Sequence, residues 1–386
     1  MIPLSVPNLK GNELKYVTEA IESEWVSTGG SFIDRFEQEI AEYLNVEQAV
    51  ACQSGTAGLH LALQLAGVTL NTEVIVPTLT FIAAVNPVKY LGANPIFMDS
   101  DDSLCIDVDK VEAFCEKECT LTDNGLVNKS TNKVIKAIVV VHVFGNMANM
   151  EKLMKLASKY KLIVIEDATE ALGTHFVSGE YNGKFAGTIG DFGVFSFNGN
   201  KIITTGGGGM LVAKDRTLAK QARYLSTQAK DDELHYIHHE IGYNYRMTNL
   251  QAALGVAQLE QLEEFIEVKK NNYFTYKEQI ESIAGLSLLA FSNTIRPNYW
   301  FYSLIIERDF VNINRDNLLR FLQNNGVQTR PIWGLIHQQK PYSNNQAYKI
   351  EKALKFVEII LNIPCSSNLT QQDVRKVTDL LTKLET

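Results

Sequence analysis

The sequence has little of what several classes of protein require. Its five cysteines are odd in number and irregularly spaced, which favours reduced thiols in a cytoplasmic protein over a disulfide framework. The formal net charge is −8, so no basic field is available for nucleic acid. The longest apolar run, AIVVVHVF at 137–144, is too short to span a bilayer, and the N-terminal residues do not resemble a signal peptide. We therefore expect neither nucleic acid nor a membrane as a partner.

A pattern of metal ligands is also missing. Cys115 and Cys119 could share a helix face, but no second pair or nearby histidine completes a zinc site. His235, His238 and His239 are closely spaced without a clear ligand pattern, which is typical of a solvated segment. We expect no metal site.

What is present is the composition of an ordinary globular protein, with 45% hydrophobic and 21% charged residues. At 386 residues the chain is too long for one small core. Between about residues 45 and 215, short apolar runs such as EVIVP and LIVIE alternate with helical patterns. This alternation predicts an α/β fold with a mostly parallel sheet covered by helices.

The pattern changes near residue 249. Apolar residues at helical spacing over 249–283 predict one long helix, and mixed strand and helix patterns follow it. We therefore predict a large α/β domain over 1–249, with an N-terminal helical segment, and a smaller α+β unit over 250–386 that begins with the long helix.

In open α/β sheets, ligands bind beyond the carboxyl ends of the strands. The stretch QSGTA places Gly55 and Thr56 between an expected strand and an expected helix. Free N–H groups at a helix N-terminus, with a glycine that allows close approach, form an anion site. Simple N-capping by Ser54 or Thr56 is the alternative.

Three further side chains follow expected strands. Asp167, at the end of a strongly apolar strand, needs a cationic partner if it is buried, or it caps the next turn. Phe81 could stack on a flat ligand or pack in the core. Lys201 could be a solvated loop residue, but near these groups it becomes a candidate nucleophile. The combination suits pyridoxal 5′-phosphate (PLP), whose ring nitrogen, phosphate, ring face and aldehyde need these four partners.

The motifs SGTAGLHLAL, IEDATEALG, FSFNGNKIITTGGGGM and GYNYRMTNLQAALGVAQLE together resemble the DegT/DnrJ/EryC1/StrS family of nucleotide-sugar aminotransferases. The resemblance covers almost the whole chain. It implies an aspartate-aminotransferase-like fold (PLP fold type I), a homodimer and PLP as cofactor, with pyridoxamine phosphate during turnover. In one branch of the family a histidine replaces the reactive lysine, and Lys201 argues against that branch.

The resemblance also implies roles for single residues. Lys201 would be the catalytic residue that forms the Schiff base, and Asp167 would partner the pyridine nitrogen. Asn244 would reach the phosphate from the other subunit. Glu170 stands where many relatives carry Gln or His, and it would lie near the phenolic oxygen of the cofactor, where a carboxylate must be protonated or well paired. The cofactor-binding set is Gly55, Thr56, Ala57, Phe81, Asp167, Glu170, Ser196 and Asn244.

For the substrates, the resemblance implies L-glutamate as amino donor and a keto-sugar nucleotide as acceptor. Its candidate contacts are Trp25, Thr28, His142, Arg330, Trp333 and His337. An Arg or His could bind the diphosphate, and a Trp could stack on the base. Two alternatives stay open: Trp25 and Trp333 could fill the core, and His142 could be a satisfied buried histidine.

Within the family, STQAKDDELHY and TRPIWGLIH are similar to the branch that aminates UDP-linked 4-keto-6-deoxy-N-acetylhexosamines for bacterial surface glycans. A GDP-perosamine-type or dTDP-3-amino-sugar transaminase is the alternative enzyme. A catalytically silent relative that only binds PLP or a sugar nucleotide is the alternative from another class.

Overall fold

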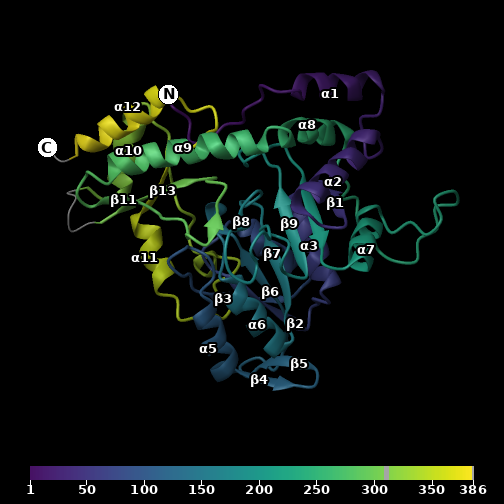
Figure 1. The fold of residues 1–386 in the computed structure, drawn as a ribbon. Coiled ribbons are helices and arrows are strands. Elements are labelled where there is room, and N and C mark those ends of the chain that lie inside the picture. The colour runs from purple at the N-terminus through teal and green to yellow at the C-terminus, as the bar shows by residue number, and fades with distance from the viewer. Residues whose placement is uncertain (308–312, 385–386) are drawn as a thin grey trace.

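A computed structural model describes residues 1–307 and 313–384. Its centre is a ten-stranded sheet (Figure 1). The strands along its main path are, in spatial order, β1 (Ala49–Cys52), β10 (Gly209–Ala213), β9 (Phe192–Ser196), β7 (Ile163–Asp167), β6 (Val134–Val141), β2 (Thr72–Pro77), β3 (Asn94–Met98) and β15 (Ala347–Tyr348). The remaining two, β4 (Cys119–Thr122) and β5 (Gly125–Asn128), form a hairpin that pairs with β6.

The pairings from β9 through β7, β6, β2 and β3 to β15 are parallel, and those of β10 with β9 and with β1 are antiparallel. The central strands are buried on both faces, which explains their continuous apolar runs. The predicted α/β fold with a mostly parallel sheet is confirmed.

Helices cover this sheet (Figure 1). They are α3 (Gly55–Leu65), α4 (Asn86–Tyr90), α5 (Val108–Glu118), α6 (Met150–Tyr160) and α7 (Arg216–Ser226). Helix α6 illustrates why they form: Asn149 caps its N-terminus, and Met150, Leu153 and Leu156 lie on one buried face.

Four further strands, β11 (Leu286–Leu288), β13 (Tyr302–Ile306), β16 (Ile360–Ile363) and β14 (Arg330–Pro331), form an antiparallel sheet. The helices of this half of the chain are α9 (Leu262–Ile280), α10 (Arg315–Asn324), α11 (Lys352–Ile359) and α12 (Gln371–Thr382). Strand β15 nevertheless joins the large sheet beside β3, and β12 (Ile295–Arg296) pairs with β8 (His175–Phe176). The boundary at residue 249 stays a prediction.

The long helix predicted over 249–283 is interrupted. Helix α8 (Asn249–Leu259) packs on α1 (Glu13–Glu22) and α2 (Ser31–Leu44), and α9 starts only at Leu262. The side chain of Gln261 donates to the carbonyl of Ala257, which a continuing helix would use for the Gln261 N–H. That N–H donates to Gln258 instead. The spacing of apolar residues gives no information about a side chain that competes for a backbone acceptor, so this break could not be predicted from it.

No helix in the described ranges is long and apolar enough to cross a membrane.

Candidate active site

A pocket of about 540 Å³ lies at the carboxyl ends of β7 and β9 and the start of α3. Residues from β14 and the segment before β13 close its other side, so both halves of the chain line it. The predicted residues that line it are Gly55, Thr56, Phe81, Asp167, Glu170, Ser196, Lys201, Arg330 and Trp333. Local sequence patterns from widely separated segments thus converge on one cavity.

Lys201 lies between a carboxyl group and an aromatic ring. Its Nζ is 3.6 Å from Oε1 of Glu170, and 4.1 Å from the ring centroid of Trp300. The side chains of Lys201 and Glu170 are both largely buried, with exposed fractions of 13% and 3%. Lys201 is therefore held in the pocket and is not a solvated loop residue.

Glu170 is fixed on its other side by the backbone. The N–H of Phe144 donates to Oε2 at 2.9 Å. Burial raises the pKa of Glu170 to about 7, against the lowering effects of the Lys201 charge and the Phe144 N–H. This carboxyl group can therefore change protonation state near neutral pH.

Asp167 ends β7 and is also buried, with 3% exposure. Its Oδ1 accepts the N–H of Thr169 at 3.1 Å. Burial raises the pKa of Asp167, while hydrogen bonds from Thr169 and the charge of Lys201 lower it. Such a carboxylate can accept a charged hydrogen-bond donor from a ligand in the pocket.

The start of α3 borders the pocket and has the features expected of an anion site. Gly55 and Thr56 are its first two residues, where N–H groups lack intrahelical partners. A Cβ on Gly55 would come within 3.1 Å of Ser196, so glycine lets the helix start lie against the end of β9. The capping alternative is also realised, because Ser54 accepts the N–H of Ala57 at 3.1 Å. Ala57 itself is not among the lining residues.

Aromatic side chains form much of the remaining wall. Phe81 is 54% exposed just before the 3₁₀ turn Ile82–Ala84, and lines the pocket. Trp333 is half-buried, with its ring 4.7 Å from that of Phe144. Trp300 lines the pocket too, and its Nε1–H donates to the carbonyl of Asn200. Flat rings can pack against such walls.

Four of the predicted substrate contacts lie outside this pocket. Trp25 is 63% exposed, which excludes a core position in this chain, and Thr28 is partly exposed. His142 is fully buried, and its Nε2 contacts Oε2 of Glu166 at 2.8 Å, which is the satisfied-histidine alternative. His337 contacts Thr78 through Nδ1 at 2.6 Å, and burial lowers the pKa of His337. Their roles toward a substrate stay predictions.

Asn244 also lies away from the pocket. It is exposed and bridges to Thr227 in an antiparallel manner. Gly207 and Gly208 do line the pocket, and the run continues into β10 at Gly209. A Cβ on Gly209 would lie 2.5 Å from the carbonyl carbon of Ser54, so the glycine allows β10 to pass close to the start of α3.

Sequence reasoning missed several lining residues, among them Thr169, Trp300 and Asn198. Thr169 lies within the motif IEDATEALG, and its place two residues after Asp167 is a recognisable turn signal. Trp300 comes from the start of an apolar run that predicts only a strand. Nothing local indicates that it lies over Lys201.

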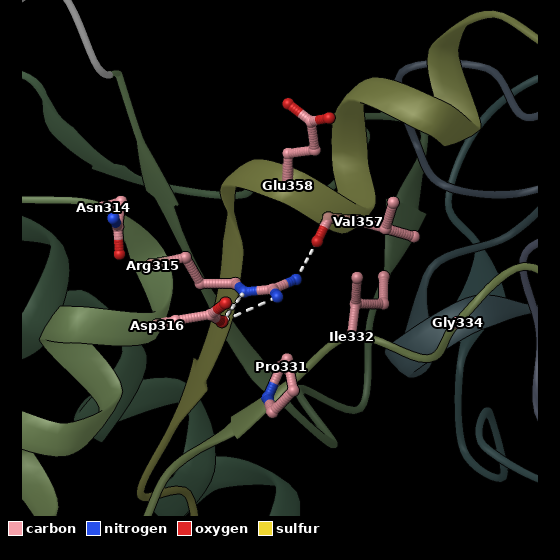
Figure 2. Close-up of a pocket in the computed structure, with 8 residues that line it drawn as sticks. All are labelled: Asn314, Arg315, Asp316, Pro331, Ile332, Gly334, Val357 and Glu358. Atoms are coloured by element: carbon pink, nitrogen blue, oxygen red, sulfur yellow. Dashed lines mark hydrogen bonds and ion pairs between the residues drawn. The ribbon is translucent and has the colours of Figure 1, made fainter.

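A second hollow of about 500 Å³ lies between α10 and α11. Figure 2 shows Arg315 lying across it, between the carboxylate of Asp316 and the backbone carbonyl of Val357. Its size is close to that of the first pocket, but its arginine is already paired. Size alone therefore does not identify the functional cavity.

The match to the model of the DegT/DnrJ/EryC1/StrS aminotransferase family runs over residues 7–382. The chain belongs to this family. Its sequence is 38% identical to a GDP-perosamine synthase of Escherichia coli O157:H7, covering 97% of this chain and 95% of that protein. It is 30% identical to a UDP-4-amino-4,6-dideoxy-N-acetyl-beta-L-altrosamine transaminase of Campylobacter jejuni, covering 99% and 96%.

Solved structures of aminotransferases have the same fold. The aminotransferase TlmJ of Streptoalloteichus hindustanus superimposes with a TM-score of 0.87 at 28% identity, over 99% of this chain and 98% of that one. The chain is thus a PLP-dependent sugar aminotransferase of the DegT/DnrJ/EryC1/StrS family. The pocket fits that cofactor, because a lysine, two buried carboxyl groups and a helix N-terminus border one cavity walled by aromatic rings.

Proposed function

We propose that this chain transfers the amino group of L-glutamate to a keto sugar linked to GDP. The observation that carries the reaction is the arrangement of Lys201, Glu170 and Asp167 in one pocket beside the N-terminus of α3. The relative that makes GDP-perosamine supports the choice of nucleotide, since it matches 97% of the chain at 38% identity.

PLP, when bound, supplies an aldehyde that takes up the amino group and a ring that accepts electrons from the neighbouring carbon. Lys201 would hold the cofactor covalently and, once displaced by the donor, move a proton as base and acid. Asp167 would keep the ring nitrogen protonated. Thr56 and Ser196 would bind the phosphate at the helix N-terminus, and Phe81 would cover one face of the ring.

The acceptor would enter past β14. Among the described residues, the guanidinium of Arg330 bonds only the carbonyl of Thr329, at 3.2 Å. Its other N–H donors can therefore bind a diphosphate or a carboxylate. Trp333 could stack on the nucleobase. Because transamination replaces a carbonyl oxygen with an amine, the substrate of a GDP-perosamine-forming enzyme carries its carbonyl where perosamine carries nitrogen.

A UDP-linked 4-keto-6-deoxy-N-acetylhexosamine is the second candidate acceptor. It is favoured by the 30% identical relative, which is a transaminase of a UDP-linked amino sugar. Its lower identity ranks it behind the GDP-linked sugar.

We further propose a homodimer in which Asn244 completes the partner's phosphate site. The segment between α7 and α8 extends away from the body of the chain (Figure 1). It exposes large apolar side chains, with Leu234 at 81%, Tyr236 at 71% and Ile241 at 84% exposure. A second copy of the chain is a natural cover for such side chains. A cytoplasmic location stays a prediction.

The test is to incubate the purified protein with L-glutamate and GDP-, UDP- or dTDP-linked keto sugars, and to detect amino sugars by mass spectrometry. We expect amination of the GDP-linked 4-keto sugar. Amination of only the UDP-linked sugar would support the second candidate, and amination at position 3 of a dTDP-linked sugar would overturn both. Binding of PLP without any turnover would favour the catalytically silent relative.

A further inference from the structure

The carboxyl group of Glu170 is held in a fixed orientation toward the amino group of Lys201. Glu170 Oε1 faces the reactive nitrogen at 3.6 Å, while its Oε2 is held by the N–H of Phe144. The side chain of Asn298 further anchors this turn, donating to the backbone carbonyl of Glu170 at 3.0 Å. The carboxyl group is thus fixed with one oxygen directed at the lysine.

We propose that Glu170 is the proton-exchange partner of Lys201. A proton leaves Nζ of the Lys201 ammonium for Oε1 of Glu170, which produces a neutral amine and a neutral carboxylic acid, and the same proton can return. This inference deepens the proposed function and depends on it, because it takes Lys201 as the reactive lysine. A neutral amine is the form that can attack a carbonyl carbon or accept a proton.

Desolvation favours the exchange. An ammonium and a carboxylate both lose hydration in a buried site, whereas an amine and a carboxylic acid lose much less. The separation of 3.6 Å exceeds that of a good hydrogen bond. A small rotation of the flexible lysine side chain would bring the two groups into contact.

The surroundings of Glu170 act in the same direction. Asp167, at the end of β7, repels a negative charge on Glu170. The thiol of Cys105 would do the same if it were ionised. Burial, however, raises the pKa of Cys105 to about 12, so that thiol stays neutral. Lys201 is the cation that opposes these effects, and the pKa of Glu170 is raised to about 7 overall. The carboxyl group is therefore ready to hold a proton near neutral pH.

Asp167 does not fit this role as well. Its proposed partner is the ring nitrogen of the cofactor, and its Oδ1 accepts the N–H of Thr169. The ion pair that the structure gives Lys201 is with Glu170. Two buried carboxyl groups of one pocket thus have separable tasks.

The test measures the reactivity of Lys201 directly, in the full-length protein freed of cofactor. Trace acetic anhydride labels neutral amines between pH 5 and 10, and mass spectrometry quantifies acetylation of Lys201 against the exposed Lys340. For the wild type we expect two rises with pH, the lower centred near pH 7. Glu170→Gln, which cannot exchange the proton, should lose the lower rise.

Glu73→Gln is the matched control. Glu73 is also buried with a raised pKa, but it lies at the start of β2 and hydrogen-bonds Asn128 and Thr131. This variant should keep both rises. A single rise in the wild type, or two rises in Glu170→Gln, would overturn the proposal. A single rise in the wild type would overturn the proposal even if the glutamine variant failed to fold.

A separate measurement distinguishes this proposal from the proposed function. Borohydride reduction of the holoenzyme should fix the cofactor on Lys201. Cofactor found on another lysine would overturn the assignment of the reactive residue, and this inference with it. Cofactor on Lys201 together with a single labelling rise would overturn only the role of Glu170.

Discussion

Two buried regions meet at the end of β7, and they differ in how many protein hydrogen-bond donors surround a carboxylate. Glu166 does not line the pocket; it accepts the N–H groups of Gly187, Ile189 and Gly190 at 2.5–2.9 Å, and its Oε2 also contacts Nε2 of His142. Facing the pocket, the neighbouring Asp167 has a hydrogen bond from the N–H of Thr169. Adjacent residues on one strand point to opposite faces, which separates these environments.

The difference shows which charges are structural and which are available to a ligand. Glu166 is surrounded by protein donors, so its charge is compensated without any ligand. Asp167 and Glu170 are also buried, but they retain acceptor capacity toward the cavity. The same contrast separates Arg315, which is paired inside the second hollow, from Arg330, which borders the first.

A large effect on catalysis is expected from the pocket residue Asp167. Asp167→Asn should lower kcat by about 100- to 1,000-fold, because a neutral amide cannot stabilise a protonated ring nitrogen. It should not lower the stability of the cofactor-free protein, since burial already disfavours the charged form. Steady-state kinetics and thermal unfolding check both parts. An active variant would show that this carboxylate is structural.

The next effect is on stability and concerns Glu166, which does not line the pocket. Glu166→Gln should lower the free energy of unfolding by about 3–5 kcal/mol. The amide NH₂ group of glutamine cannot accept a hydrogen bond, so some of the backbone N–H groups that now donate to Glu166 would lose their acceptor. Chemical denaturation measures this. The comparison would break if Glu166→Gln proved as stable as Asp167→Asn.

The smallest effect concerns pH. The folded-state pKa of Glu170 is raised from 4.5 to about 7, so folding is favoured at low pH and this contribution is lost as pH rises through 7. Glu170→Gln cannot ionise, so its stability relative to the wild type should increase between pH 4 and pH 8, by up to about 3 kcal/mol. Thermal melts of the cofactor-free proteins measure the trend.

Much of this arrangement could be predicted from local sequence. The strands of the sheet are apolar runs. Polar residues at the end of a strand or a few residues beyond it, such as Asp167 and Lys201, lie at one edge of the sheet because parallel strands end together. The anion site at Gly55 and Thr56 follows from the same strand-to-helix logic.

The remainder depends on contacts between distant segments. Trp300 lies over Lys201 from a position about a hundred residues away, and Arg330 borders the same cavity from another sheet. His142 also shows the limit, because its strand-end position was compatible with both a buried partner and a ligand contact. Only the packing of Glu166 against it distinguishes the two within this chain.

The central claim is that Lys201 is the lysine that carries the cofactor, and it can be tested directly. The purified protein is loaded with PLP, reduced with borohydride, digested and analysed by mass spectrometry. The account predicts one modified peptide, with the pyridoxyl group on Lys201, and no such modification in Lys201→Ala. Modification of a different lysine, or an unchanged yield in Lys201→Ala, would contradict it.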